Sequence, residues 1–258
     1  MRIPPNHPRA ASLIIRERLV EAYRQGIVAP EGLLAHGRGE AFDYLLGERT
    51  IPEAESAIEA AAALLLLAAR PVISVNGNAC ALAAEELVKL SKVTGARLEV
   101  NLFYRTRQRE EAIARRLKEA GAEEVYGVGE QASATIPELS SERRRVDPRG
   151  ILAADVVLVP LEDGDRTEAL RRLGKQVIAI DLNPLSRTAR MATVTIVDNI
   201  VRALPRLVQA CATLRTLGRE ELASRVSSFN NERNLRAALA RILEGLRRLA
   251  GEEDGGEG

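Results

Sequence analysis

The sequence predicts an α/β protein built on a doubly wound, Rossmann-like parallel sheet of about six strands. A helical N-terminal region and C-terminal helices are expected to cover this sheet. Short apolar runs rich in β-branched residues recur along the chain, as expected for strands buried on both faces. The runs alternate with segments of helical period, which is the pattern of repeated strand–helix–strand units. Polar residues directly follow several of the runs, and in open parallel sheets that edge binds ligands.

The N-terminal 70 residues are predicted to be helical. Residues 8–25 carry an apolar stripe at helical spacing, with proline in the first turn and glycine after the last. Residues 30–46 have the same period, but we expect a break at the HGRGE string, residues 36–40. Residues 51–69 are rich in alanine and apolar on most faces, so we expect that helix to be buried against the sheet or against a partner subunit.

Residues 71–250 form the predicted nucleotide-binding domain. Its expected strands are residues 72–75, 97–102, 124–128, 155–159, 176–180 and 193–197. Its expected helices are residues 79–94, 106–120, 166–173, 200–217, 220–227 and 231–250. The first strand is followed by an Asn-Gly-Asn turn, but both the G-x-G-x-x-G fingerprint and the Walker A string are missing. The likeness to common nucleotide folds is therefore one of architecture only.

Two segments lack a clear period. Residues 129–150 contain two prolines and the basic run Arg143-Arg144-Arg145, and a loop of this length is usually functional or mobile. We favour a solvated basic run, and the alternative is a lid over an anionic ligand. Residues 251–258 are acidic and rich in glycine, so a disordered tail is predicted.

Composition narrows the class of protein. Hydrophobic residues make up 46% and charged residues 28% of the 258 residues, which predicts a soluble globular protein. A net charge of +1 argues against a broad nucleic-acid surface, and the apolar runs are too short to span a membrane. The start of the chain lacks the apolar core of a signal peptide, so we expect a cytoplasmic protein. The spacing of Cys80 and Cys211 matches no metal site, and the sequence leaves open whether a disulfide joins them.

Polar groups leave the ends of three successive predicted strands between residues 154 and 205. Glu162, Asp163 and Asp165 could hold Mg²⁺ through water, or could form a solvated acidic loop that caps a helix. Asp181 suits a ribose hydroxyl or a turn, and Asn199 suits a phosphate or base-edge contact or a helix cap. Their joint placement along one sheet edge favours a ligand-binding role.

Three long strings carry a resemblance to a known family. They are GIVAPEGLLAHGRGEAFDYLLGE from Gly26, PVISVNGNACALAAEELVKLSKVTGARLEVNLFYRT from Pro71, and ADVVLVPLEDGDRTEALRRLGKQVIAIDLNPLSRTARMATVTIVDNIVRALPR from Ala154. They resemble the archaeal phosphopantothenate synthetases, the 4-phosphopantoate–β-alanine ligases, and the resemblance covers about residues 3–235.

The resemblance implies an enzyme of archaeal coenzyme A biosynthesis. Such an enzyme condenses 4-phosphopantoate with β-alanine at the expense of ATP with Mg²⁺, through an acyl-adenylate, and releases 4′-phosphopantothenate, AMP and diphosphate. A homodimer is implied as well. The positions that match the family's ATP-binding residues are Arg16, Arg38, Asp181, Leu182, Asn183, Arg187, Thr188, Asn199 and Ile200. No catalytic residue and no metal ligand is assigned, and His36 could be a base or a structural donor.

Two alternative functions stay open at this point, and one of them is a sugar-phosphate enzyme with a doubly wound sheet. A non-catalytic nucleotide-sensing module on the same Rossmann-like fold would share the strand-end polar residues. What distinguishes the ligase is its need for fixed cations, because a carboxylate, a phosphomonoester and a triphosphate repel one another in a low dielectric. Those cations could come from Arg16, Arg38, Arg187 and Arg190, and Mg²⁺ could supply more positive charge.

Overall fold

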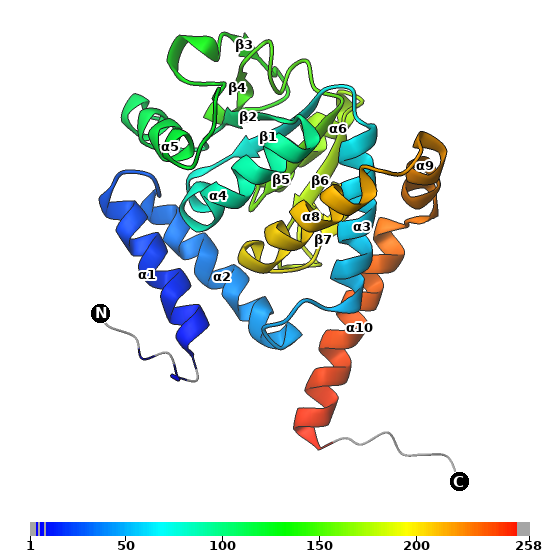
Figure 1. Cartoon of the computed structure of the whole chain (residues 1–258). Coiled ribbons are helices and arrows are strands. Elements are labelled where there is room, and N and C mark those ends of the chain that lie inside the picture. The colour runs from blue at the N-terminus through cyan, green and yellow to red at the C-terminus, as the bar shows by residue number, and fades with distance from the viewer. Residues whose placement is uncertain (1–3, 5, 8, 252–258) are drawn as a thin grey trace.

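The computed structural model describes residues 4, 6–7 and 9–251, and at its centre lies a five-stranded parallel sheet (Figure 1). The strand order is β2-β1-β5-β6-β7. The strands are β1 (Pro71–Val75), β2 (Arg97–Val100), β5 (Val156–Pro160), β6 (Gln176–Ile180) and β7 (Val194–Ile196). This confirms the predicted fold class with one strand fewer than expected. The tail predicted to be disordered lies, apart from Gly251, outside the described residues.

One of the six predicted strands, residues 124–128, does not form. Tyr126 makes a single parallel bridge with Glu99 and exchanges backbone hydrogen bonds with its neighbours on β2. Gly127 and Gly129 then adopt positive φ angles of 77° and 58°. Left-handed backbone cannot continue an extended ladder, so the chain turns away after one paired position.

Helices cover one face of the sheet. Alternate strand residues, among them Ile73, Leu158 and Ile178, pack on that face in the larger core cluster. Among the helices that contribute buried residues to this cluster are α3 (Pro52–Leu67), α4 (Gly77–Thr94), α5 (Arg107–Glu119) and α8 (Ile200–Leu214). The alanine-rich helix α3 contacts α8, α9 (Arg219–Ser228), β7 and α10 (Asn231–Ala250). Its expected burial is therefore confirmed, and its own chain provides the cover.

The opposite face is covered differently. The strand residues that alternate with those of the larger cluster, such as Val157 and Val177, pack on this face against α6 (Gly164–Arg172) and against an irregular segment. That segment, residues 129–154, is named here the crossover segment. It holds η1 (Gly129–Gln131), β3 (Ala134–Thr135), η2 (Glu142–Arg144) and β4 (Arg145–Val146), with β3 and β4 antiparallel. Several of its apolar side chains are fully buried, which favours a structural part of the core over a lid.

The crossover segment returns the chain from one edge of the sheet to the other side of β1. The chain runs from β1 to β2, then crosses back to β5, and continues through β6 to β7. The strand order thus reverses between β1 and β5. In open α/β sheets, the crevice at such a reversal is the usual place for a ligand.

The N-terminal region contains α1 (Ala10–Arg24) and α2 (Pro30–Leu46). Helix α2 is continuous, so the break predicted at the HGRGE string is wrong. Glycine weakens a helix by only about 1 kcal/mol, and two glycines do not interrupt this one. The segment after β6, which is not among the predicted helices, is also partly helical, since α7 spans Arg187–Met191 and Ser186 caps it by accepting from the Ala189 N–H. The division of the chain at residue 70 stays a prediction.

Two further expectations concern cysteines and membranes. Cys80 and Cys211 are free and buried, so no disulfide joins them, and burial raises the pKa of each thiol to about 12. Within the described ranges, no helix has the length and apolar character to span a membrane.

A buried carboxylate fixes the crossover segment to the sheet. Glu99 on β2 is fully buried and accepts hydrogen bonds from the backbone N–H groups of Asp147 at 3.0 Å and Ile151 at 2.5 Å. Burial raises the pKa of the Glu99 carboxyl to about 7. The packing of the crossover segment against the sheet therefore depends on one side chain that satisfies two backbone donors.

We predict that Glu99→Ala lowers the free energy of unfolding by about 2–5 kcal/mol, because it leaves two buried N–H groups without an acceptor and opens a cavity. Urea denaturation measures this change. Because the pKa of Glu99 is higher in the folded state, the native protein holds an extra proton between the ordinary and the raised value. The stability advantage of the wild type over Glu99→Ala should therefore shrink as pH rises through that interval.

The matched control is Glu123→Ala, which removes an exposed carboxylate from the preceding turn. It should change the stability by less than about 0.5 kcal/mol at any of these pH values. Equal stabilities of the wild type and Glu99→Ala would contradict the anchoring role of this carboxylate.

Candidate functional site

A pocket of about 820 Å³ lies at the carboxyl edge of the sheet, across the point where the strand order reverses. Its walls come from segments that follow β1, β2, β5 and β6, from the start of α8, and from α2. The lining includes Asn76–Asn78, Leu102–Tyr104, Leu161–Gly164, Asp181–Asn183, Ser186–Thr188, Asn199–Ile200 and, on α2, His36 and Arg38. The pocket thus occupies the place that the topology predicts for a ligand.

The structure brings together eight of the nine residues that the sequence singled out. The eight that line the pocket are Arg38, Asp181, Leu182, Asn183, Arg187, Thr188, Asn199 and Ile200. Arg16 does not line it. Its guanidinium forms an ion pair with Glu40 on α2 at 2.9 Å, and Tyr44 also hydrogen-bonds to Glu40.

The loop after β6 is shaped by Asp181. Its carboxylate accepts hydrogen bonds from the Asn183 N–H at 2.9 Å and from the Ser186 hydroxyl at 2.5 Å. Burial raises the pKa of this carboxyl. The turn-forming interpretation of Asp181 is therefore confirmed, and the same turn presents Asp181 and Asn183 to the pocket.

Arg187 is held by carboxylates of α6. Its guanidinium pairs with Asp165 and Glu168, and 53% of its side chain is exposed. A Cβ on Gly164 would lie only 2.6 Å from the Cβ of Arg187, so glycine permits this close approach of α6 and α7. An anion that binds Arg187 therefore competes with two carboxylates.

The acidic residues after β5 are each engaged by arginine. Glu162 has a fully buried side chain and pairs with Arg143 and Arg166, so a solvated loop is wrong for it. Asp163 caps α6 by accepting from the Arg166 N–H at 3.0 Å, and Asp165 pairs with Arg187. In the part of the chain that the structure describes, no three metal-ligating side chains gather into a cation site.

Arg143 is a site residue that the sequence did not reveal. The solvated interpretation of the basic run is wrong for this arginine, which is buried and lines the pocket. Its guanidinium contacts Glu162 and, at 2.9 Å, Asp163, while Arg144 and Arg145 are exposed. Burial lowers the pKa of Arg143 to about 9. Three consecutive arginines carry no signal that tells which of them turns inward.

The end of β7 ties α2 to the sheet. Asn199 caps α8 and donates from its side-chain amide to Asp43 on α2 at 2.9 Å, which confirms the capping interpretation. Arg202 pairs with both Asp43 and Asp198. This network holds α2 as a wall of the pocket, where burial lowers the pKa of His36.

The sequence model of the family described as phosphopantothenate/pantothenate synthetase matches residues 53–245. The chain belongs to this family. The 4-phosphopantoate–β-alanine ligase of Thermococcus kodakarensis is 54% identical over 97% of this chain and 95% of its own length. The enzymes of the same name from Thermococcus onnurineus and Methanosarcina mazei are 52% and 50% identical, again over 97% of this chain.

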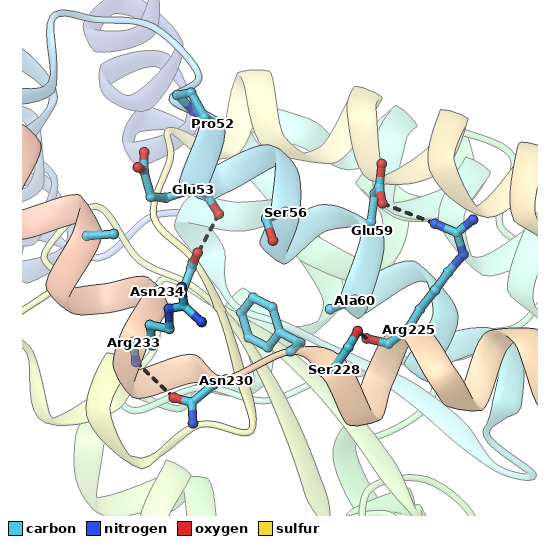
Figure 2. Close-up of a pocket in the computed structure, with 12 residues that line it drawn as sticks. Pro52, Glu53, Ser56, Glu59, Ala60, Arg225, Ser228, Asn230, Arg233 and Asn234 are labelled. Carbon is cyan, nitrogen blue, oxygen red and sulfur yellow. Dashed lines mark hydrogen bonds and ion pairs between the residues drawn. The ribbon is translucent and has the colours of Figure 1, made fainter.

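This member of the synthetase family has a second, smaller hollow of about 480 Å³ between α3, α9 and α10 (Figure 2). Its walls are joined by the Arg225–Glu59 ion pair at 3.2 Å and by a hydrogen bond from Asn234 to the Glu53 carbonyl at 3.0 Å. None of the nine predicted residues lines it. The pocket at the carboxyl edge is therefore the candidate active site.

Proposed function

We propose that this chain joins 4-phosphopantoate to β-alanine with ATP, and yields 4′-phosphopantothenate, AMP and diphosphate. The observation that carries the proposal is the gathering of eight predicted nucleotide contacts around one pocket at the strand-order reversal. Family membership, and identity of 50–54% to relatives named as this ligase over nearly the whole chain, support the substrate pair.

The proposed chemistry has two steps. A carboxylate oxygen of 4-phosphopantoate attacks the α-phosphorus of ATP, and diphosphate leaves. The β-alanine nitrogen then attacks the acyl carbon, the bond to AMP breaks, and the amine loses a proton. Because a free carboxylate resists attack by an amine, the first step supplies the leaving group that the second step needs.

The pocket supplies fixed positive charge for these anionic reactants. Among the residues that the structure describes, four arginines line it: Arg38, Arg109, Arg143 and Arg187. Fixed cations in a site that excludes water stabilise developing negative charge without reorganisation. The carboxylates of Glu162, Asp163 and Asp165 are already paired with arginines, and our proposal leaves Mg²⁺ to the phosphates of the nucleotide.

The products test the route. With ATP, Mg²⁺, 4-phosphopantoate and β-alanine, we expect AMP and diphosphate in a one-to-one ratio with 4′-phosphopantothenate. Chromatography of the reaction mixture measures these products. Without β-alanine, adenylation should stop at about one turnover per site. ADP with orthophosphate would contradict the adenylate route, and nucleotide binding without turnover would favour the sensing module instead.

Arg187 tests the nucleotide half of the pocket. We expect Arg187→Lys to resemble Arg187→Ala, because lysine keeps the charge but loses the planar fork that can hold two phosphate oxygens. The loss of a charge-assisted contact is worth roughly 1.5–3 kcal/mol, or about ten- to a hundredfold in kcat/KM for ATP.

Arg172→Lys is the matched control for this pair of variants. Arg172 also pairs with Glu168 but is not part of the pocket lining. Its kinetics should match the wild type. If both folded Arg187 variants turn over like the wild type, Arg187 does not contact the nucleotide.

We also propose that the chain forms a symmetric dimer through its N-terminal helices and α10. Exposed apolar side chains lie on these elements, namely Ile14, Leu45, Leu243 and Leu246, and α2 contacts α10. Helix α10 projects beyond the layers of the sheet (Figure 1). Such apolar side chains are candidates for an isologous interface.

Light scattering at micromolar concentration should give twice the mass of the chain. Leu246→Glu should shift the protein toward monomer, because a charge would be buried at the interface. Leu173→Glu, at an exposed leucine after α6, is the control and should leave the mass unchanged. A monomeric wild type would refute the dimer.

A further inference from the structure

The side chain of Asn199 is bound at both ends by the protein itself. Its Oδ1 accepts from the Val201 N–H at 3.3 Å and so caps α8, while its Nδ2 donates to Asp43 on α2 at 2.9 Å. Asn199 is only 4% exposed and lines the pocket, whereas Asp43 is buried and is not part of the lining. A helix cap needs only the first of these two contacts, so the second has another purpose.

Asp43 fixes which end of the Asn199 amide faces which neighbour. An ionised carboxylate only accepts hydrogen bonds, so Nδ2 must face it, and a rotated amide would set its own carbonyl oxygen against the carboxylate. Within the described residues, the second N–H of Nδ2 and the second lone pair of Oδ1 have no partner. The amide therefore keeps one donor and one acceptor in a fixed orientation at the wall of the pocket.

Arg202 holds Asp43 in place for this contact. Its Nη1 donates at 3.2 Å to the carboxylate oxygen that also accepts from Asn199, and its Nη2 donates at 2.5 Å to the other oxygen. Burial acts to lower the pKa of Arg202, but the hydrogen bonds and charges of Asp43 and Asp198 raise it above its ordinary value. The charge of Asp43 is thus balanced, and its carboxylate is fixed from α8.

A purely structural role for Asp43 can be separated from a role toward Asn199. The same end of α2 has a second connection to the end of β7, because the Thr50 hydroxyl donates to the buried carboxylate of Asp198 at 2.7 Å. Asp198 in turn pairs with Arg202 at 2.6 Å. This second connection fastens the chain after α2 without a contact to the Asn199 amide, so it provides the comparison that isolates the Asp43–Asn199 contact.

We propose that Asp43 is a positioning residue for the nucleotide and acts through the side-chain amide of Asn199. This rests on the proposed function, because it takes Asn199 to contact ATP. Without Asp43, the amide can rotate about its last bond, and ATP binding must then restrict that rotation. A group that is held in its binding orientation beforehand avoids this cost, which raises the affinity for the ligand.

The first test is the steady-state kinetics of Asp43→Ala. We expect the KM for ATP to rise about three- to tenfold, as for the loss of one well-oriented hydrogen bond. The kcat and the KM for 4-phosphopantoate should stay close to the wild type, because a contact made equally in the ground state and the transition state changes KM alone. An unchanged KM for ATP in the folded variant would overturn the proposal.

Asp43→Asn separates orientation of the amide from stability. The amide oxygen that it introduces can replace the oxygen that accepts from both Asn199 and Arg202, whereas the opposite rotamer would keep a single bond to Arg202. We therefore expect a KM for ATP near the wild type. The melting temperature should fall by about 2–4 °C, because Arg202 loses part of its charged partner. A KM raised as far as in Asp43→Ala would contradict the role of the acceptor oxygen.

Thr50→Val is the matched control. It removes the hydrogen bond to Asp198 from the same network and leaves the contacts of Asp43 with Asn199 and Arg202 in place. The melting temperature should again fall by about 2–4 °C, while the KM for ATP matches the wild type. An equal rise of this KM in Thr50→Val and Asp43→Ala would overturn the proposal, because loosening of α2 would then explain both.

A double-mutant cycle tests the route through Asn199. Asn199→Ala should raise the KM for ATP by itself, and adding Asp43→Ala should raise it no further. A second rise of the same factor would show that Asp43 acts independently, and the proposal would fail. If Asp43→Ala does not fold, the combined variant Asp43→Leu with Arg202→Met carries the same comparisons, since it replaces the whole ion pair by apolar side chains.

The positioning role and the proposed function fail in distinguishable ways. A wild type that binds ATP but makes no 4′-phosphopantothenate refutes the function alone. The Kd for ATP from calorimetric titration then replaces KM in each comparison, and it should rise in Asp43→Ala but not in Asp43→Asn or Thr50→Val. A wild type that binds no ATP would overturn the positioning role as well.

Discussion

The arrangement of the pocket depends on the buried carboxylate of Glu162. It holds Arg143 from the crossover segment and Arg166 from α6, and Arg166 also donates to the Ser74 hydroxyl on β1 at 2.8 Å. Segments that are distant in sequence therefore meet at one side chain. Removing one partner of a buried ion pair costs about 3–5 kcal/mol, because an uncompensated charge stays in a low dielectric. The end of β5 is thereby fixed relative to both halves of the sheet.

Much of the fold follows from local pattern. Four of the five strands described are largely apolar and rich in β-branched residues, and such runs are visible in the sequence. The run at residues 124–128 looks similar, but the left-handed glycines that end it are not distinguishable from ordinary loop glycines without the structure. The glycines of α2 mislead in the opposite direction, since the packing of α2 against the sheet edge keeps that helix continuous.

The candidate site was predictable where it follows strands and not where it depends on distant partners. Asp181 and Asn199 stand directly after strands, so parallel topology alone places them at one edge. Arg143 lies in an aperiodic segment, and its burial depends on Glu162, a carboxylate whose proximity no local pattern encodes. Arg16 lies on the predicted helix, but it pairs with Glu40 and does not line the pocket, so its contact with ATP stays a prediction.

The adjacency of β1 and β5 has a consequence for how the molecule assembles. These two neighbours in the sheet are separated by the whole length of chain that forms α4, β2, α5 and the crossover segment. Pairing across such a gap requires closure of a long loop, an entropic cost that precedes the contacts that offset it. The local strand–helix units on either side need no such closure, whereas the seam between them does. Since the pocket straddles that seam, a partly folded chain has no binding site, and ligand binding reports on completion of the fold.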